Sequence, residues 1–233
     1  MSKVLIIAAH PDDEVLGCGA TIARHTKAGD EVHVVILAEG VTSRDIVRAR
    51  GKRTGELSEL SKAAHLANDV LGVKSLSLHD FPDNRMDSLD LLDIVKVVEE
   101  KIRLIMPETL YTHHAGDVNI DHCRIHEAVV TATRPQPEQP VKTLLFFEIP
   151  SSTEWQPPGS AQPFVPDWFV DVSETISLKM QALAAYRSEM RPWPHSRSYE
   201  AVEHLARWRG ATIGCEAAEA FKLGRKIISE VMI

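Results

Sequence analysis

The sequence predicts an α/β protein, a Rossmann-like three-layer sandwich with a mostly parallel central sheet. Two observations support this prediction. Short apolar runs rich in β-branched residues alternate along the chain with longer segments in which apolar residues recur every three or four positions. The first of these runs is apolar at every position, as expected for a parallel strand that helices cover on both faces.

The first two strand-and-helix units are predicted near the N-terminus. Residues 4–9 form an unbroken apolar strand, and the helix predicted over residues 16–28 ends at a Gly-Asp stop signal. Residues 31–38 (EVHVVILA) are the second predicted strand. The segment 44–71 is long and charged but has apolar residues at steps of three and four, so a helix is expected over most of it.

Two more units follow in the same order. A strand over residues 75–79 follows a Gly-Val turn. The helix predicted over residues 89–105 stops before Pro107, and residues 109–112 begin a further strand. A polar segment separates this strand from a helix predicted over residues 122–133. The alternation of strands and helices indicates βαβ units and therefore a parallel sheet.

The rest of the chain is less regular. The segment 135–166 contains eight of the thirteen prolines and one strand-like run, residues 143–149, so we expect a strand followed by a shaped loop. Helices are predicted over residues 174–190 and 200–209. Because no repeat, low-complexity tract or linker interrupts the sequence, residues 1–233 are expected to form a single domain.

Composition and charge limit the classes of function. The chain has 26 Lys and Arg against 33 Asp and Glu, a net charge of −7, and its basic residues form no long run, which disfavours binding to nucleic acid. The three cysteines are scattered, and the N-terminus lacks signal-peptide features, so a cytoplasmic location is expected. No apolar stretch approaches the roughly 18 residues that span a membrane, so no integral membrane segment is expected. The sequence leaves homo-oligomer formation open.

The most informative segment is His-Pro-Asp-Asp-Glu at residues 10–14, directly after the first predicted strand. Open α/β sheets place their ligand crevice at this carboxyl edge. Unpaired burial of carboxylates is costly, whereas a metal ion would pair them, so His10 and Asp13 are candidate ligands of one cation. The local alternative is a surface turn in which Asp12 or Asp13 caps the next helix.

A second cluster of histidines and carboxylates spans residues 112–122 and again follows a predicted strand. Both clusters are therefore expected at the same edge of the sheet. Histidine with carboxylate is the ligand chemistry of zinc, and three protein ligands leave a position for water, as in catalytic sites. The alternative is a metal pair of His122 and His126, one helical turn apart, although Cys123 stands where a zincin has Glu.

These motifs resemble the LmbE/PIG-L family of zinc-dependent de-N-acetylases. The resemblance rests on AHPDDE after the first strand, on Asp-His at residues 121–122 before a helix, and on Thr-Ser-Arg at residues 42–44. It implies that Asp12 is the general base and that Asp121 orients a neighbouring histidine. It also implies one zinc ion per chain with three ligands, His10, Asp13 and His122.

One position departs from the family pattern. Many members have a histidine three residues before the last ligand, where it helps to stabilise the oxyanion, but this chain has Asn119. The amide of Asn119 is a candidate catalytic donor, as amide side chains are in other oxyanion holes. His113, His114 or His195 could reach the same spot instead.

Four residues are candidates for contacts with the substrate. Arg53 and Asp83 lie in looser matches to the substrate side of the family, and an arginine fork suits a hydroxyl or phosphate group. His195 lies with Arg197 in a proline-bounded loop and could hold a phosphate or sugar oxygen. His114, in the second cluster, is the fourth. The alternatives are a helix-surface salt bridge for Arg53 and a solvated loop for His195.

The sequence therefore predicts a zinc-dependent hydrolase that removes the N-acetyl group from a small N-acetylated amino sugar or its conjugate. Two alternatives remain. A metal-binding, non-catalytic or regulatory homologue would bind zinc and ligand without releasing acetate. A hydrolase of a different amide or ester on the same scaffold would act on other acyl amino sugars.

Overall fold

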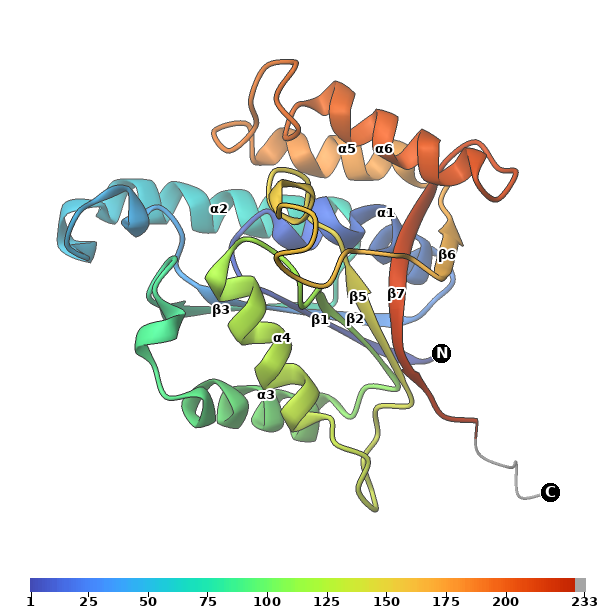
Figure 1. The fold of residues 1–233 in the computed structure, drawn as a ribbon, viewed down its shortest axis with the longest axis horizontal. Helices are drawn as coiled ribbons and strands as arrows, with labels where there is room; N and C mark the ends of the chain where they lie inside the picture. The colour runs from blue at the N-terminus through green and yellow to red at the C-terminus, as the bar shows by residue number, and fades with distance from the viewer. Residues whose placement is uncertain (229–233) are drawn as a thin grey trace.

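The computed structural model describes residues 1–228 and contains a seven-stranded sheet with helices on both faces (Figure 1). The strand order is β3-β2-β1-β4-β5-β7-β6. The first five strands in the chain are parallel, whereas β7 is antiparallel to β5 and β6, so the predicted α/β class with a mostly parallel sheet is confirmed. The strands are β1 (Lys3–Ala8), β2 (Glu31–Ala38), β3 (Ser75–Phe81), β4 (Thr109–His113), β5 (Thr143–Phe147), β6 (Trp168–Asp171) and β7 (Ala218–Lys226).

Helices cover the two faces of the sheet in separate layers, one above and one below it in Figure 1. The upper layer consists of α1 (Asp13–Lys27), α2 (Thr54–Val70), α5 (Ile176–Ala185) and α6 (Tyr199–Ala211). The lower layer consists of α3 (Leu91–Ile105) and α4 (Ile120–Ala132). The three-layer arrangement predicted from the sequence is therefore present. No helix in the described part of the chain is long and apolar enough to cross a membrane.

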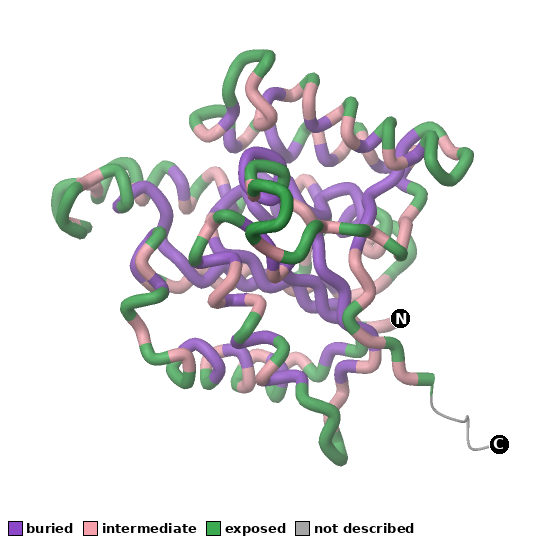
Figure 2. Tube along the Cα trace, in the orientation of Figure 1, coloured by how far each residue is buried: buried purple, intermediate pink, exposed green. Residues whose placement is uncertain are grey.

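Strand β1 separates two apolar cores. Because successive side chains of a strand point to opposite faces, Val4 and Ile6 join the core beneath α1, α2 and α5, whereas Leu5 and Ile7 join the core against α3 and α4. All four side chains are fully buried, and Figure 2 shows the central strands as a continuous buried region. The unbroken apolar sequence of β1 is thus explained by burial on both faces.

Helix α2 covers most of the helix predicted over residues 44–71 but begins only at Thr54. The preceding residues form an irregular segment with two single-turn 3-10 helices, Thr42–Arg44 and Arg50–Lys52. Ile46 and Val47 in this segment are exposed, so they provide no apolar face that could pack a helix against the sheet. Segment 44–53 is therefore held by ion pairs rather than by a core.

Strands β6 and β7 were not predicted from the sequence. β6 has only four residues, and β7 (AEAFKLGRK) contains charged side chains and a glycine, so its sequence does not show the apolar pattern of a strand. Only the first four residues of β7 are buried. The helix predicted over residues 174–190 is shorter than expected, because α5 ends at Ala185 and irregular turns follow.

Helix α1 is interrupted at Cys18, where the backbone has φ −151° and ψ 24°. The interruption leaves backbone groups without helical partners. Glu219 of β7 accepts hydrogen bonds from the amides of residues 20–21, at 3.2 and 2.7 Å. The buried Lys179 ammonium donates to the carbonyl oxygen of Leu16 at 2.7 Å and to Glu219 at 2.6 Å. This buried ion pair thus completes the hydrogen bonding of the helix that begins at the candidate site.

Candidate active site

The two polar clusters found in the sequence meet at the carboxyl edge of β1 and β4, where they line a cavity of about 270 Å³. The loop between β1 and α1 supplies His10 and Asp12, the first residue of α1 supplies Asp13, and the start of α4 supplies Asn119 and His122. The remaining lining comes from the loops after β2, β3 and β5, from Leu60 of α2 and from the segment between α5 and α6. This is the edge at which an open parallel sheet is expected to bind ligands.

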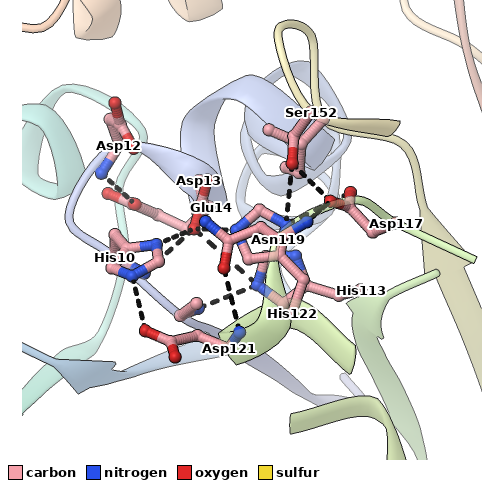
Figure 3. Close-up of polar contacts among 12 residues, drawn as sticks. His10, Asp12, Asp13, Glu14, His113, Asp117, Asn119, Asp121, His122 and Ser152 are labelled. Atoms are coloured by element: carbon pink, nitrogen blue, oxygen red, sulfur yellow. Dashed lines mark hydrogen bonds and ion pairs between the residues drawn. The ribbon is translucent and has the colours of Figure 1, made fainter. Parts of the chain in front are cut away.

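The three candidate metal ligands converge on one point (Figure 3). Asp13 Oδ2 lies 3.2 Å from His10 Nδ1 and also 3.2 Å from His122 Nε2. Asp13 and His122 are buried, and His10 is only slightly more accessible. The fold therefore brings together the first and second sequence clusters with two imidazoles and one carboxylate facing one another.

Each of the two histidines is held from behind by a carboxylate. The other ring nitrogen of His10, Nε2, lies 3.0 Å from Asp121 Oδ2, and that of His122, Nδ1, lies 3.2 Å from Asp117 Oδ2. Carboxylates in this position fix the tautomer and orientation of metal-binding histidines. Asp121 thus contacts His10, in keeping with the orienting role implied by the family resemblance. Asp117 plays the equivalent part for His122 and was not singled out in the sequence.

The charges at this point suit a divalent cation. Burial alone would lower the pKa of His122, but Asp13 and Asp117 raise it to about 9. Burial alone would raise the pKa of Asp13, but the adjacent histidines hold it well below its ordinary value. Within residues 1–228 the buried Nε2 of His122 makes no well-formed hydrogen bond, although Asp13 Oδ2 lies 3.2 Å from it. A cation between these groups would bind that nitrogen and would neutralise the carboxylate, so the donor set fits a bound metal.

Asp12 has an unusual backbone conformation, with φ 124° and ψ −29°. A non-glycine residue at such a positive φ is strained by roughly 1–3 kcal/mol, and strain of this kind concentrates at functional sites. The neighbouring Glu14 holds the conformation, because its Oε2 accepts a hydrogen bond from the Asp12 amide at 3.0 Å. Tyr186 Oη and Asn68 Nδ2 in turn donate to Glu14 Oε1 at 2.7 and 3.0 Å.

The side chain of Asp12 is buried at the cavity and faces a guanidinium. Arg197 Nη1 lies 3.0 Å from Asp12 Oδ2. Burial raises the pKa of Asp12 well above its ordinary value, although Arg197 opposes this shift. A carboxyl with a raised pKa beside a candidate metal site has the properties of a residue that accepts and returns a proton.

Asn119 lies at the start of α4 and lines the cavity. Its side-chain oxygen accepts a hydrogen bond from the Asp121 amide at 2.9 Å and so caps the helix. Because the oxygen is used for the cap, the amide NH₂ group is the end that can donate toward a ligand. The structure thus places Asn119 in the cavity wall, and its role as an oxyanion donor stays a prediction.

Asp83 is the predicted substrate residue that the structure does bring to the cavity. It lies 3.3 Å from His10 Nε2 and accepts a hydrogen bond from the Ser43 amide at 2.9 Å. Burial alone would raise the pKa of Asp83, but His10 and Ser43 lower it below its ordinary range. Asp83 Oδ1 also accepts a hydrogen bond from Asn84 Nδ2 at 2.9 Å, so its contacts are with His10, with Asn84 and with the loop after β2 that forms part of the cavity wall.

The other three predicted substrate residues lie outside the lining formed by residues 1–228. Arg53 is paired with Asp45 through two contacts of 2.7 and 2.9 Å, as in the salt-bridge alternative. His114 Nε2 lies 2.9 Å from the Gln162 carbonyl oxygen. His195 Nδ1 accepts a hydrogen bond from the backbone amide of Arg197 at 3.0 Å. The structure thus does not bring these three side chains to the candidate site.

Two further histidines of the sequence have other partners. His126 Nδ1 donates to the carbonyl oxygen of His113 at 2.9 Å, so His126 is turned away from the cluster and the alternative metal pair with His122 is not formed. His113 Nε2 accepts a hydrogen bond from the Ala9 amide at 2.8 Å, and its ring stacks on His122 with centroids 3.9 Å apart. His113 therefore supports the orientation of His122.

A family model matches the part of the chain that contains these residues. The model for PIG-L, described as GlcNAc-PI de-N-acetylase, matches residues 5–133, which include all three candidate ligands and Asp12. The chain is 29% identical to the uncharacterized deacetylase YaiS of Escherichia coli (strain K12), over 79% of this chain and 90% of that protein. It is 27% identical to 1D-myo-inositol 2-acetamido-2-deoxy-alpha-D-glucopyranoside deacetylase 1 of Saccharopolyspora erythraea, over 82% of this chain and 78% of that protein.

Solved structures share the whole fold. The conserved protein TT1542 from Thermus thermophilus superposes with a TM-score of 0.76 at 24% identity, covering 100% of this chain and 99% of that one. GalB, the 4-carboxy-2-hydroxymuconate hydratase of Pseudomonas putida, superposes with a TM-score of 0.75 at 20% identity and full coverage of both chains. At these identities the likeness concerns the fold alone, and a hydratase on this fold shows that the site residues must decide the reaction.

Proposed function

The chain belongs to the PIG-L family, described as GlcNAc-PI de-N-acetylase, and we propose that it is a zinc-dependent hydrolase that removes the acetyl group from an N-acetylated amino sugar or its conjugate. One observation carries the proposal. His10, Asp13 and His122 converge beside the buried carboxylate of Asp12 in a single cavity. This arrangement combines a three-ligand metal site with a proton acceptor, which amide hydrolysis requires.

His10, Asp13 and His122 would hold the zinc ion, with Asp121 and Asp117 fixing the two imidazoles. Two nitrogen ligands and one oxygen ligand form a set that zinc accepts, and three protein ligands leave a coordination position open. When bound, zinc polarises the acyl carbonyl and makes a nearby water molecule more acidic. One zinc ion per chain is sufficient for this role.

Asp12 would move the proton. Its carboxylate accepts a proton from the attacking water as the new C–O bond forms at the acetyl carbon. The protonated Asp12 then gives that proton to the amine nitrogen as the C–N bond breaks, so that acetate and the free amino sugar are the products. The amide of Asn119 would donate a hydrogen bond to the negatively charged oxygen that develops between these two steps.

The decisive experiment measures acetate release by the zinc-loaded protein. The panel contains free, phosphorylated, nucleotide-linked and inositol-linked N-acetylglucosamine, and Asp12→Asn serves as the control. Release by the wild type that disappears in Asp12→Asn, with zinc content unchanged, is the expected result. Zinc binding without acetate release from any member of the panel would refute the proposal.

Asn119 is the feature that favours a second candidate function. A family position at which many members have histidine is occupied by an amide that also caps α4. If the amide does not serve catalysis, the protein is a metal-binding homologue that retains ligand without turnover. Equilibrium binding of an N-acetyl sugar by the zinc-loaded protein, together with absent acetate release, would identify this case.

A further inference from the structure

We propose that Arg197 is a positioning residue for Asp12, which it holds by one carboxylate oxygen so that the other oxygen faces the attacking water. The inference rests on the proposed function, because it assigns a partner to the proton-transferring carboxylate. Arg197 lies beyond residues 5–133, the part of the chain that the family model matches. The inference therefore concerns a part of the cavity outside the residues that the family model matches.

The contact between the two side chains is direct and largely shielded from water. Arg197 Nη1 lies 3.0 Å from Asp12 Oδ2, and the Asp12 side chain is only 4% exposed. Among the described residues no hydrogen bond reaches Oδ1 of Asp12, and both side chains line the cavity. Charge-assisted hydrogen bonds of this kind are strong and directional, so the carboxylate plane is fixed with one oxygen available.

The guanidinium is itself held in place by surrounding segments. Arg197 Nε donates to Ser151 Oγ at 2.9 Å, which ties it to the loop after β5. The Arg197 amide donates to His195 Nδ1 at 3.0 Å, and its carbonyl oxygen accepts from the Arg191 amide at 3.1 Å. The adjacent Ser198 caps α6 by accepting from the amide of Ala201 at 3.0 Å. The segment Pro-His-Ser-Arg-Ser therefore directs one arginine, and His195 supports that arginine.

Two independent supports thus act on Asp12. Glu14 holds its strained backbone through the amide, and Arg197 holds its side chain through Oδ2. If the ion pair only joined two loops, the partner of Arg197 would not need to be Asp12, the strained residue at the cavity. A lysine cannot reproduce the arrangement, because it lacks the planar fork that contacts Asp12 and Ser151 at the same time.

The kinetic experiment compares Arg197→Ala and Arg197→Lys with Arg207→Gln, an exposed arginine of α6 paired with Glu203. We expect kcat for acetate release to fall on the order of 10²-fold in Arg197→Ala, because misplacement of a catalytic group by about 1 Å has an effect of this size. Zinc content and KM should stay within threefold. Added guanidinium ion should restore part of kcat, ammonium ion should not, and Arg207→Gln should match the wild type.

A second measurement tests the pair without substrate. Thermal unfolding of the metal-free single variants Arg197→Gln and Asp12→Asn and of the double variant forms a double-mutant cycle. Arg197→Gln leaves a buried carboxylate unpaired, so its melting temperature should be the lowest, and the additional Asp12→Asn change should raise it. Additive effects on the melting temperature would overturn the proposed pairing, whether or not the wild type releases acetate. The absence of acetate release by the wild type refutes, by itself, only the deacetylase assignment.

Given an active wild type, a kcat for Arg197→Ala within twofold of the wild-type value would overturn the positioning role. The positioning role would also be overturned if Arg197→Ala lost zinc together with activity and guanidinium ion did not restore the activity. A merely structural arginine would lower stability without rescue by guanidinium, so these readouts separate the two roles.

Discussion

Asp117→Asn is expected to weaken zinc binding about 10- to 100-fold, the usual effect of removing the carboxylate behind a metal-binding histidine. Asp117 Oδ2 lies 3.2 Å from His122 Nδ1 and accepts a hydrogen bond from Thr153 Oγ1 at 2.7 Å. Burial alone would raise the pKa of Asp117, but His122 holds it at about 2, so the group is a carboxylate at neutral pH. The expected loss in affinity corresponds to about 1.4–2.8 kcal/mol of binding free energy.

The loss arises because the asparagine amide keeps the size of the carboxylate but removes the charge that orients and polarises His122. Competition of the metal-depleted protein with a chromophoric zinc chelator measures the dissociation constant. Asp69→Asn, an exposed carboxylate on α2, is the matched control and should bind zinc like the wild type. A folded Asp117→Asn variant with a dissociation constant within twofold of the wild-type value would refute the reasoning.

Three further outcomes are expected. Burial alone would lower the pKa of His122, but nearby carboxylates raise it to about 9. The metal-free protein therefore gains stability from this proton below about pH 6.5 and loses that stability as the pH rises to about 9. A free energy of unfolding, measured with urea, that stayed constant or rose across this range would contradict the prediction. Asn119→Ser retains a helix cap but removes the amide donor, so kcat should fall about 10²- to 10³-fold at an unchanged melting temperature. An unchanged kcat would exclude Asn119 as a donor. Lys179→Met leaves Glu219 buried without its cation, so it should lower the free energy of unfolding by about 3–5 kcal/mol. The control Lys96→Met removes an exposed lysine and should change this free energy by no more than about 1 kcal/mol. Equal effects of the two variants in denaturant titrations would contradict a stabilising role of the buried ion pair.

The candidate metal site was predictable because parallel strands constrain where their ends meet. His10 and Asp13 directly follow β1, and His122 follows the neighbouring β4, so the sheet brings distant sequence clusters to one edge. Asp121 was expected to orient a histidine, and it lies 3.0 Å from His10. Because β1 and β4 are neighbouring parallel strands, the two sequence motifs that follow them lie close together.

Other contacts could not be predicted because they depend on loop paths that the sequence does not specify. Arg197 and His195 occupy the same short segment, and no sequence pattern indicates that the arginine reaches Asp12 while the histidine accepts from its backbone. Arg53 shows the same difficulty, because Asp45 becomes its partner only when the segment before α2 folds irregularly. Side chains placed by strand ends were therefore easier to assign than side chains placed by loops.

The distribution of the cavity residues along the chain bears on specificity. The candidate ligands and Asp12 lie within residues 5–133, whereas Ser151, Arg191 and Arg197 come from later loops. Glu189, also from the later part, joins the two parts of the wall by pairing with Arg44 at 3.0 Å. In the proposed mechanism the first group would bind zinc and move the proton, with Arg197 of the second group positioning Asp12, while a sugar conjugate that extends from the metal would contact the second group. Differences in substrate among proteins that share the metal motif are therefore expected to follow from the loop after β5 and the segment between α5 and α6.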